Sequence, residues 1–164
     1  MSNTALQLYD VGDNGIKRIL GGTTSETGLK QRQVNAVQAV NQKLVVGSGG
    51  SGLELLDLST GKSETIWDDG SDPIETLALS DKQQVFASSN FSSVMINPAT
   101  GDSSPIRIPG RPAAKYSSAF ARADDKYWVG GTDGLWTYSK GAPVAHNLLS
   151  NAAHERRIAS LLYA

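Results

Sequence analysis

The chain has 164 residues, of which 39% are hydrophobic and 19% are charged, and its formal net charge is −1. This composition excludes a disordered chain and suits one folded domain with its own core. The small net charge argues against nucleic acid as a partner, and the absence of cysteine excludes disulfides and thiolate catalysis. No apolar run approaches the roughly 20 residues of a membrane span, so we expect no membrane segment in this chain.

Four short apolar runs recur at nearly regular spacing along the chain. They begin at Leu6, Leu53, Val94 and Leu135, so the last two steps are each 41 residues and the first is 47. Strand-like runs that repeat with this period are typical of β-propeller blades. The sequence therefore predicts an all-β fold: a β-propeller segment made of four-stranded antiparallel blades.

In chain order, the first expected unit is a partial blade over residues 1–20, with strands C and D at Leu6–Asp10 and Ile16–Leu20. Three complete blades, each with strands A to D, follow over residues 34–67, 74–108 and 117–148. Residues 157–163 then match strand A of a further blade. The expected strands of the complete blades are Val34–Val40, Leu44–Gly47, Leu53–Leu58, Ser63–Trp67, Ile74–Leu79, Val85–Ser88, Val94–Asn97, Pro105–Ile108, Ser117–Ala121, Tyr127–Gly130, Leu135–Tyr138 and Pro143–Leu148.

The expected turns also repeat. Short polar pairs such as Asn41-Gln42 separate strands A and B, where they tolerate hairpin dihedral angles. A glycine recurs between strands C and D, at Gly61, Gly101 and Gly141, where a tight hairpin needs a positive φ. The related Gly61-Lys62-Ser63 is interpreted as such a turn and not as a phosphate-binding loop, because a strand and not a helix follows it.

The two ends of the chain leave one blade without strand B. A slice of a larger propeller explains this arrangement, and so does a ring that the two ends close or that a second copy completes. Strands A and C of a meander run in the same direction and would have to pair directly without strand B, and open strand edges promote association. We therefore favour a slice, with the rest of a larger propeller or a second copy completing the ring.

The third blade carries a run of specific residues. Asp124-Asp125 forms a turn, Tyr127-Trp128-Val129-Gly130 a strand, Thr132-Asp133-Gly134 a second turn, and Leu135-Trp136-Thr137-Tyr138 the next strand. Over residues 115–162 this pattern resembles the two-component regulator propeller repeat. The first two blades depart from it and also suit generic WD40-like or quinoprotein-like propellers. The resemblance implies a sensory region that precedes a transmembrane segment and a histidine kinase.

Basic residues recur in the loops that lead from strand D into the next strand A. Such loops meet on one face of a propeller, around the mouth of its channel, and binding residues are common on loops of a rigid scaffold. We predict an anionic ligand or a partner surface there, and charge reversal at Arg32, Arg111 and Arg157 should then abolish binding without changing the melting temperature. The alternative is that these basic residues bind nothing and only keep the adjacent strands from aggregating. The candidate ligand- or partner-binding residues are Lys30, Arg32, Arg111, Lys115, Arg156 and Arg157.

No residues form a catalytic or metal-binding pattern. The two histidines, His146 and His154, have no zinc-ligand spacing, and the expected A strands offer mostly Ala, Val, Ser and Leu. The sequence therefore predicts a recognition module without enzymatic activity, metal or cofactor. A bacterial receptor would place it in the periplasm or outside the cell. The alternatives are a cytoplasmic WD40-like scaffold for protein partners and, less favoured, a propeller-type lyase or quinoprotein.

Overall fold

The structure is a computed structural model. It describes residues 6–12, 15–21, 29, 33–49, 52–68, 72–80, 83–90, 92–111, 117–123, 126–139 and 146–148. Every regular element within these ranges is a β-strand, which confirms the predicted all-β class.

Three four-stranded antiparallel sheets form the main body, and we call them blades 1, 2 and 3. Blade 1 comprises β3 (Val34–Val40), β4 (Lys43–Ser48), β5 (Leu53–Asp57) and β6 (Ser63–Trp67). Blade 2 comprises β7 (Thr76–Leu79), β8 (Val85–Ser88), β9 (Ser93–Ile96) and β10 (Ser103–Pro105). Blade 3 comprises β11 (Ser117–Ala123), β12 (Lys126–Gly131), β13 (Gly134–Ser139) and β14 (His146–Asn147).

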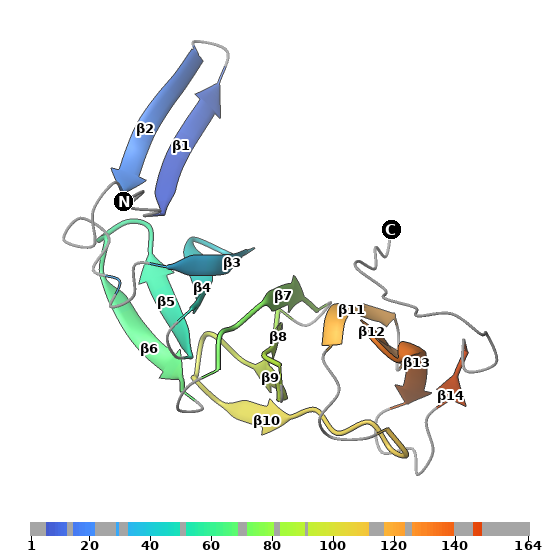
Figure 1. The fold of residues 1–164 in the computed structure, drawn as a ribbon. Helices are drawn as coiled ribbons and strands as arrows, with labels where there is room; N and C mark the ends of the chain where they lie inside the picture. Colours follow the sequence, from blue (N-terminus) through green and yellow to red (C-terminus); the bar gives the residue numbers. More distant parts are fainter. Residues whose placement is uncertain are drawn as a thin grey trace.

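The first strand of each blade lies on the inner side of an arc. Contacts join β3 to β7 and β7 to β11, and Figure 1 shows the three blades following one another around these inner strands. Within every blade the strands pair in simple chain order, as a meander. Meanders stacked radially in this way are the architecture of a β-propeller, so the predicted fold is confirmed.

The N-terminal part of the chain forms a separate hairpin. Its strands, β1 (Gln7–Gly12) and β2 (Gly15–Gly21), pair as a two-stranded antiparallel sheet, and Figure 1 shows the hairpin standing away from the three blades. The two strands overlap the expected strands C and D of the partial blade. The matching strand A, expected at residues 157–163, lies outside the described residues.

The pairing register corrects the alignment of blade 2. At the end of the second strand, Gly47 of blade 1 pairs with Leu53 and Gly130 of blade 3 pairs with Leu135. The equivalent residue of blade 2, Ser88, pairs with Ser93. Ser93 and not Val94 is therefore the equivalent of Leu53 and Leu135. The apolar run of blade 2 begins one residue late because this position holds a hydroxyl, 3.1 Å from the Ser88 hydroxyl, and apolar spacing alone misses it.

The fourth strands also differ from their expected bounds. Pro105–Ile108 was expected in blade 2, but β10 begins directly after the turn and ends at Pro105. Ile106 and Ile108 lie beyond it and pack against the core between blades 2 and 3, which explains why this apolar segment resembled a strand. In blade 3, β14 is limited to His146–Asn147, and residues 143–145 lie outside the described ranges.

The core lies between the sheets. Side chains alternate along each strand, so Val45 and Leu55 face blade 2 whereas Leu44, Val46 and Leu56 face the opposite side. The interface between blades 1 and 2 buries Val40, Val45, Leu53, Leu55, Ile74, Val85, Ala87, Val94 and Ile96. The interface between blades 2 and 3 buries Phe86, Met95, Phe120, Tyr127 and Val129. Apolar packing between the blades therefore holds the three sheets against one another.

Gly52 offers a test of close packing within blade 1. It has a φ of 69°, and a Cβ atom at this residue would lie 2.0 Å from the backbone oxygen of Trp67. We expect Gly52→Ala to lower the free energy of unfolding by about 3 kcal/mol, because left-handed strain and a backbone clash add. Gly101 is the matched control: its φ is 76°, but a Cβ there meets nothing within 4 Å. Gly101→Ala should cost about 1 kcal/mol in the same urea titration. Equal losses would contradict the clash.

Candidate functional site

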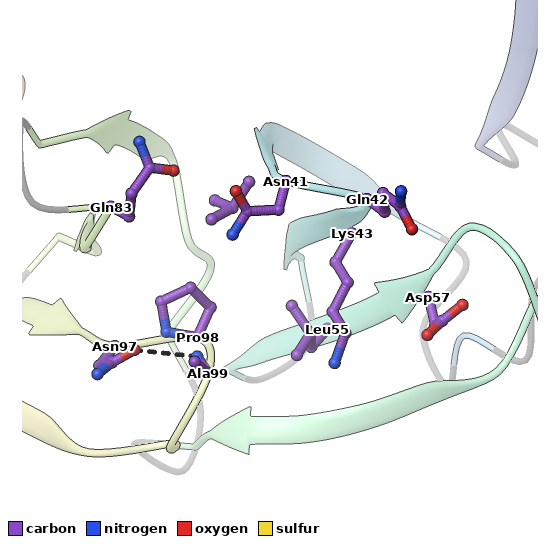
Figure 2. A pocket seen from close by; sticks show the side chains of 10 residues that line it. Asn41, Gln42, Lys43, Leu55, Asp57, Gln83, Asn97, Pro98 and Ala99 are labelled. Atoms are coloured by element: carbon purple, nitrogen blue, oxygen red, sulfur yellow. Dashed lines mark hydrogen bonds between the residues drawn. The ribbon is translucent and has the colours of Figure 1, made fainter.

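A groove opens between blades 1 and 2, at the edge where strand A turns into B and strand C into D. Its volume is about 460 Å³, within the range of small-molecule sites. Polar side chains lie on its walls above an apolar floor (Figure 2). The lining residues are Val40, Asn41, Gln42, Lys43, Leu55, Asp57, Gln83, Asn97, Pro98 and Ala99.

The sheet register of blade 1 brings two opposite charges to this groove. Lys43 begins β4 and Asp57 ends β5, and the two residues pair across the strands. Each lies two residues from Val45 or Leu55, so both belong to the face that blade 1 turns toward blade 2. Figure 2 shows the Lys43 side chain lying beside Leu55, with Asp57 to one side and Asn97 and Pro98 to the other.

The two A–B turns place amides at the rim. Asn41 and Gln83 have φ values of 55° and 57°, in the left-handed region that tight turns use. Both residues are exposed. Asparagine is among the residues that adopt this conformation readily, whereas glutamine does so at a cost. The turn chemistry therefore predicts the backbone at Asn41 but gives no indication of Gln83.

The C–D turns of blades 1 and 2 are built alike. The Asp57 Oδ1 atom accepts hydrogen bonds from the Ser59 amide at 2.9 Å, the Ser59 hydroxyl at 2.5 Å and the Thr60 amide at 3.0 Å. In blade 2, Asn97 Oδ1 accepts the Ala99 amide at 3.0 Å. Hydrogen bonds from Ser59 and from the Thr60 backbone lower the pKa of Asp57 to about 2, so this carboxylate is ionised throughout the physiological range.

Several polar groups of the groove have no partner within the protein. In the part of the chain that the structure describes, the side chains of Asn41, Gln42, Lys43 and Gln83 make no hydrogen bond or ion pair. The hydrogen bonds to Asp57 described above all reach Oδ1 and leave its Oδ2 atom as an acceptor. The groove thus presents amides, one ammonium and one carboxylate beside the buried Leu55 and Pro98. It can bind a small polar ligand.

Of the six predicted basic residues, Arg111 alone lies within the described ranges. Lys30, Arg32, Lys115, Arg156 and Arg157 lie outside them. The Arg111 side chain is only 4% exposed and pairs with Asp133, with Nη2 at 2.6 Å from Oδ1 and Nε at 2.8 Å from Oδ2. Reversing the charge of Arg111 should therefore lower the melting temperature, and not leave it unchanged as we expect for a pure binding residue. The reason is that its guanidinium connects the loop to Asp133 of blade 3.

Asp133 is the centre of this contact. It also accepts a hydrogen bond from the Trp136 indole at 3.0 Å, while Arg111 donates to the Ser117 hydroxyl at 2.7 Å. Burial raises the pKa of the Asp133 carboxyl, but the hydrogen bonds and charge of Arg111 outweigh it and lower that pKa below its ordinary value. The Thr132-Asp133-Gly134 turn and Trp136 of the repeat thus have a structural role. This contact involves the B–C turn, at the opposite edge of the blades from the groove.

No cluster of three histidine, cysteine, aspartate or glutamate side chains that could hold a metal occurs among the described residues. Nor does the described part of the chain contain a helix of the length and apolarity needed to cross a membrane.

The architecture thus defines the class of protein, a β-propeller. No protein-family model matches the sequence, and no curated protein matches it. Among solved structures, the chain is similar to the extracellular domain of BT4673, assigned as a hybrid two-component system of B. thetaiotaomicron, with a TM-score of 0.75 and 16% identity over 98% of this chain. It covers 22% of that domain's chain, so it spans about a fifth of this neighbour's length.

Two further solved structures are similar to the chain. One is the β-propeller domain of Cps50 (Swd1) from Myceliophteria thermophila, with a TM-score of 0.65 and 13% identity, covering 91% of this chain and 54% of that one. The other is the computationally designed Ika4 protein, with a TM-score of 0.58 and 16% identity, covering 84% and 82%. At such identities these likenesses show the fold alone. The BT4673 match agrees with the resemblance of residues 115–162 to two-component regulator propeller repeats.

Proposed function

We propose that this chain is part of a sensory β-propeller that binds a ligand without transforming it, in a receptor whose propeller lies outside the cytoplasm. The observation that carries the proposal is the match of 98% of the chain, at a TM-score of 0.75, to the extracellular domain of a protein assigned as a two-component system. The Asp133–Trp136 motif supports the same assignment, because it belongs to the part of the sequence that resembles the sensor repeats. Its hydrogen bond stabilises a turn of blade 3.

The ionisable groups favour binding over catalysis. A general acid or base works best with a pKa near the operating pH. The resolved pKa shifts move Asp57 to about 2, Asp133 downward and, through burial, Tyr138 to about 12. Asp57, the carboxylate that lines the groove, therefore stays ionised at neutral pH and is suited to hold a positive charge more than to exchange a proton.

Two other functions remain as competing hypotheses. A WD40-like scaffold for protein partners would use the same propeller fold, which the likeness to the Cps50 propeller domain over 91% of this chain illustrates. A lyase or quinoprotein is less favoured, because Asp57, which stays ionised, is the one carboxylate among the residues that line the groove. Fold likeness alone selects none of these, because one fold supports many functions.

A binding screen with a chemical readout tests the proposal. The full chain would be incubated with pools of small polar metabolites, and an increase in melting temperature would report binding, since a ligand that binds only the folded state stabilises it. Mass spectrometry of the recovered solute would then show whether it is unchanged. We expect a saturable increase with an intact ligand. No stabilisation by any pool, or conversion of the bound solute, would overturn the proposal.

A further inference from the structure

The groove between blades 1 and 2 displays two opposite charges on one wall. Lys43 and Asp57 are register partners, yet they form no ion pair with each other or with any other described residue. Because these two neighbouring side chains form no ion pair, both charges are available to a ligand. Between them and blade 2 lies an apolar floor formed by Val40, Leu55 and Pro98, all buried.

We propose that this groove binds a small zwitterion with an apolar side chain: an apolar α-amino acid or a short peptide of such residues. The ligand carboxylate meets the Lys43 ammonium, the ligand ammonium meets the Oδ2 atom of Asp57, and the apolar group lies over Leu55. Ligand amide groups, where present, bond to Asn41 and Gln83 at the rim. This inference rests on the proposed function and names the ligand class of its site.

The same two charges reject other ligands. A simple anion attracted by Lys43 would approach the Asp57 carboxylate, and a simple cation attracted by Asp57 would approach the Lys43 ammonium. The hydrogen bonds of its turn keep Asp57 ionised, so the discrimination does not vary across neutral pH. Only a ligand with both charges satisfies the two groups together.

The two blades provide a variant that removes the charge and keeps the turn. Asn97 occupies in blade 2 the place of Asp57 in blade 1, and both turns close with a hydrogen bond from the following glycine amide, Gly61 to Asp57 at 2.9 Å and Gly101 to Asn97 at 2.8 Å. The Asn97 side-chain oxygen also accepts the Ala99 amide, as the Asp57 side-chain oxygen accepts the Ser59 amide, so an amide oxygen supports this turn. Asp57→Asn should fold like the unmodified protein and lack only the carboxylate charge.

The experiment measures the affinity of the full chain for L-leucine, for L-leucinamide, which lacks the carboxylate, and for 4-methylpentanoate, which lacks the ammonium. We expect leucine to bind about tenfold more tightly than either analogue. Lys43→Gln should weaken leucine binding about tenfold, and Asp57→Asn should abolish the preference for leucine over 4-methylpentanoate. Lys62→Gln is the control, because Lys62 lies in the same turn, is exposed and does not line the groove.

The outcomes separate this inference from the proposed function. Leucine binding no tighter than that of its analogues, or equal losses in Lys43→Gln and Lys62→Gln, would overturn the zwitterion site. If leucine fails but another intact solute from the screen, such as a neutral sugar, stabilises the chain, the ligand class is wrong and the sensory function stands. If no solute binds, both are wrong.

Discussion

Phe86→Ala should lower the free energy of unfolding by about 3–5 kcal/mol, because it removes a large side chain from the interface between blades 2 and 3. Phe86 is fully buried, and its ring stacks on that of Phe120 with centroids 4.4 Å apart and an interplanar angle of 6°. The cavity would lie in the apolar layer between the two sheets. Urea denaturation followed by intrinsic fluorescence would measure the loss.

Tyr9→Ala is the control for the removal of an aromatic ring. Tyr9 lies on β1 and is 47% exposed, so its loss should change the free energy of unfolding by no more than about 0.5 kcal/mol. The Phe86→Ala, Phe120→Ala double variant should lose less than the sum of the single variants, because the two rings contact each other. Additive losses, or a loss below about 1 kcal/mol for Phe86→Ala, would show that face-to-face blade packing is not what stabilises this segment.

Strand positions in blade 1 could be predicted because local residue patterns determine them. The expected strands match the observed ones at both ends for β3 (Val34–Val40) and β6 (Ser63–Trp67). Each run contains β-branched residues and is flanked by a polar turn. Apolar content does not predict a strand where apolar residues are unpaired or where a paired residue is polar. Ile106 and Ile108 are apolar because they fill the space between blades, and Ser93 belongs to a strand although it is polar. Pairing depends on the neighbouring strand, which a single run does not reveal.

The groove could not be predicted from the sequence for a related reason. Lys43 and Gln83 are 40 positions apart, and only the packing of blade 2 against blade 1 brings them to one opening. The repeated turn residues Asp57 and Asn97 were a usable signal, because a side-chain acceptor at the same point of two blades marks the same turn. Basic loop residues are the more conspicuous signal in the sequence, but Arg111, the one of them within the described ranges, forms an ion pair with Asp133.

Arg111→Met should lower the free energy of unfolding at pH 7 by about 3 kcal/mol, since it leaves the Asp133 carboxylate largely buried without its cation. The side chains of Arg111 and Asp133 are 4% and 16% exposed, so water compensates little. Arg107→Met, a change at an exposed arginine of the same connection, should cost no more than about 0.5 kcal/mol. Thermal and urea unfolding of both variants would measure the difference.

The pH dependence identifies the ion pair as the cause. The folded-state pKa of Asp133 is lowered, so its contribution to stability is present above the unfolded value of about 3.9 and is lost as pH falls through the folded value. In Arg111→Met the unpaired carboxyl can instead be protonated and become neutral as the solution is acidified. The stability difference between the unmodified protein and Arg111→Met should therefore shrink below about pH 4. A difference that stays constant down to pH 2.5 would assign the loss to packing of the arginine side chain and not to its charge.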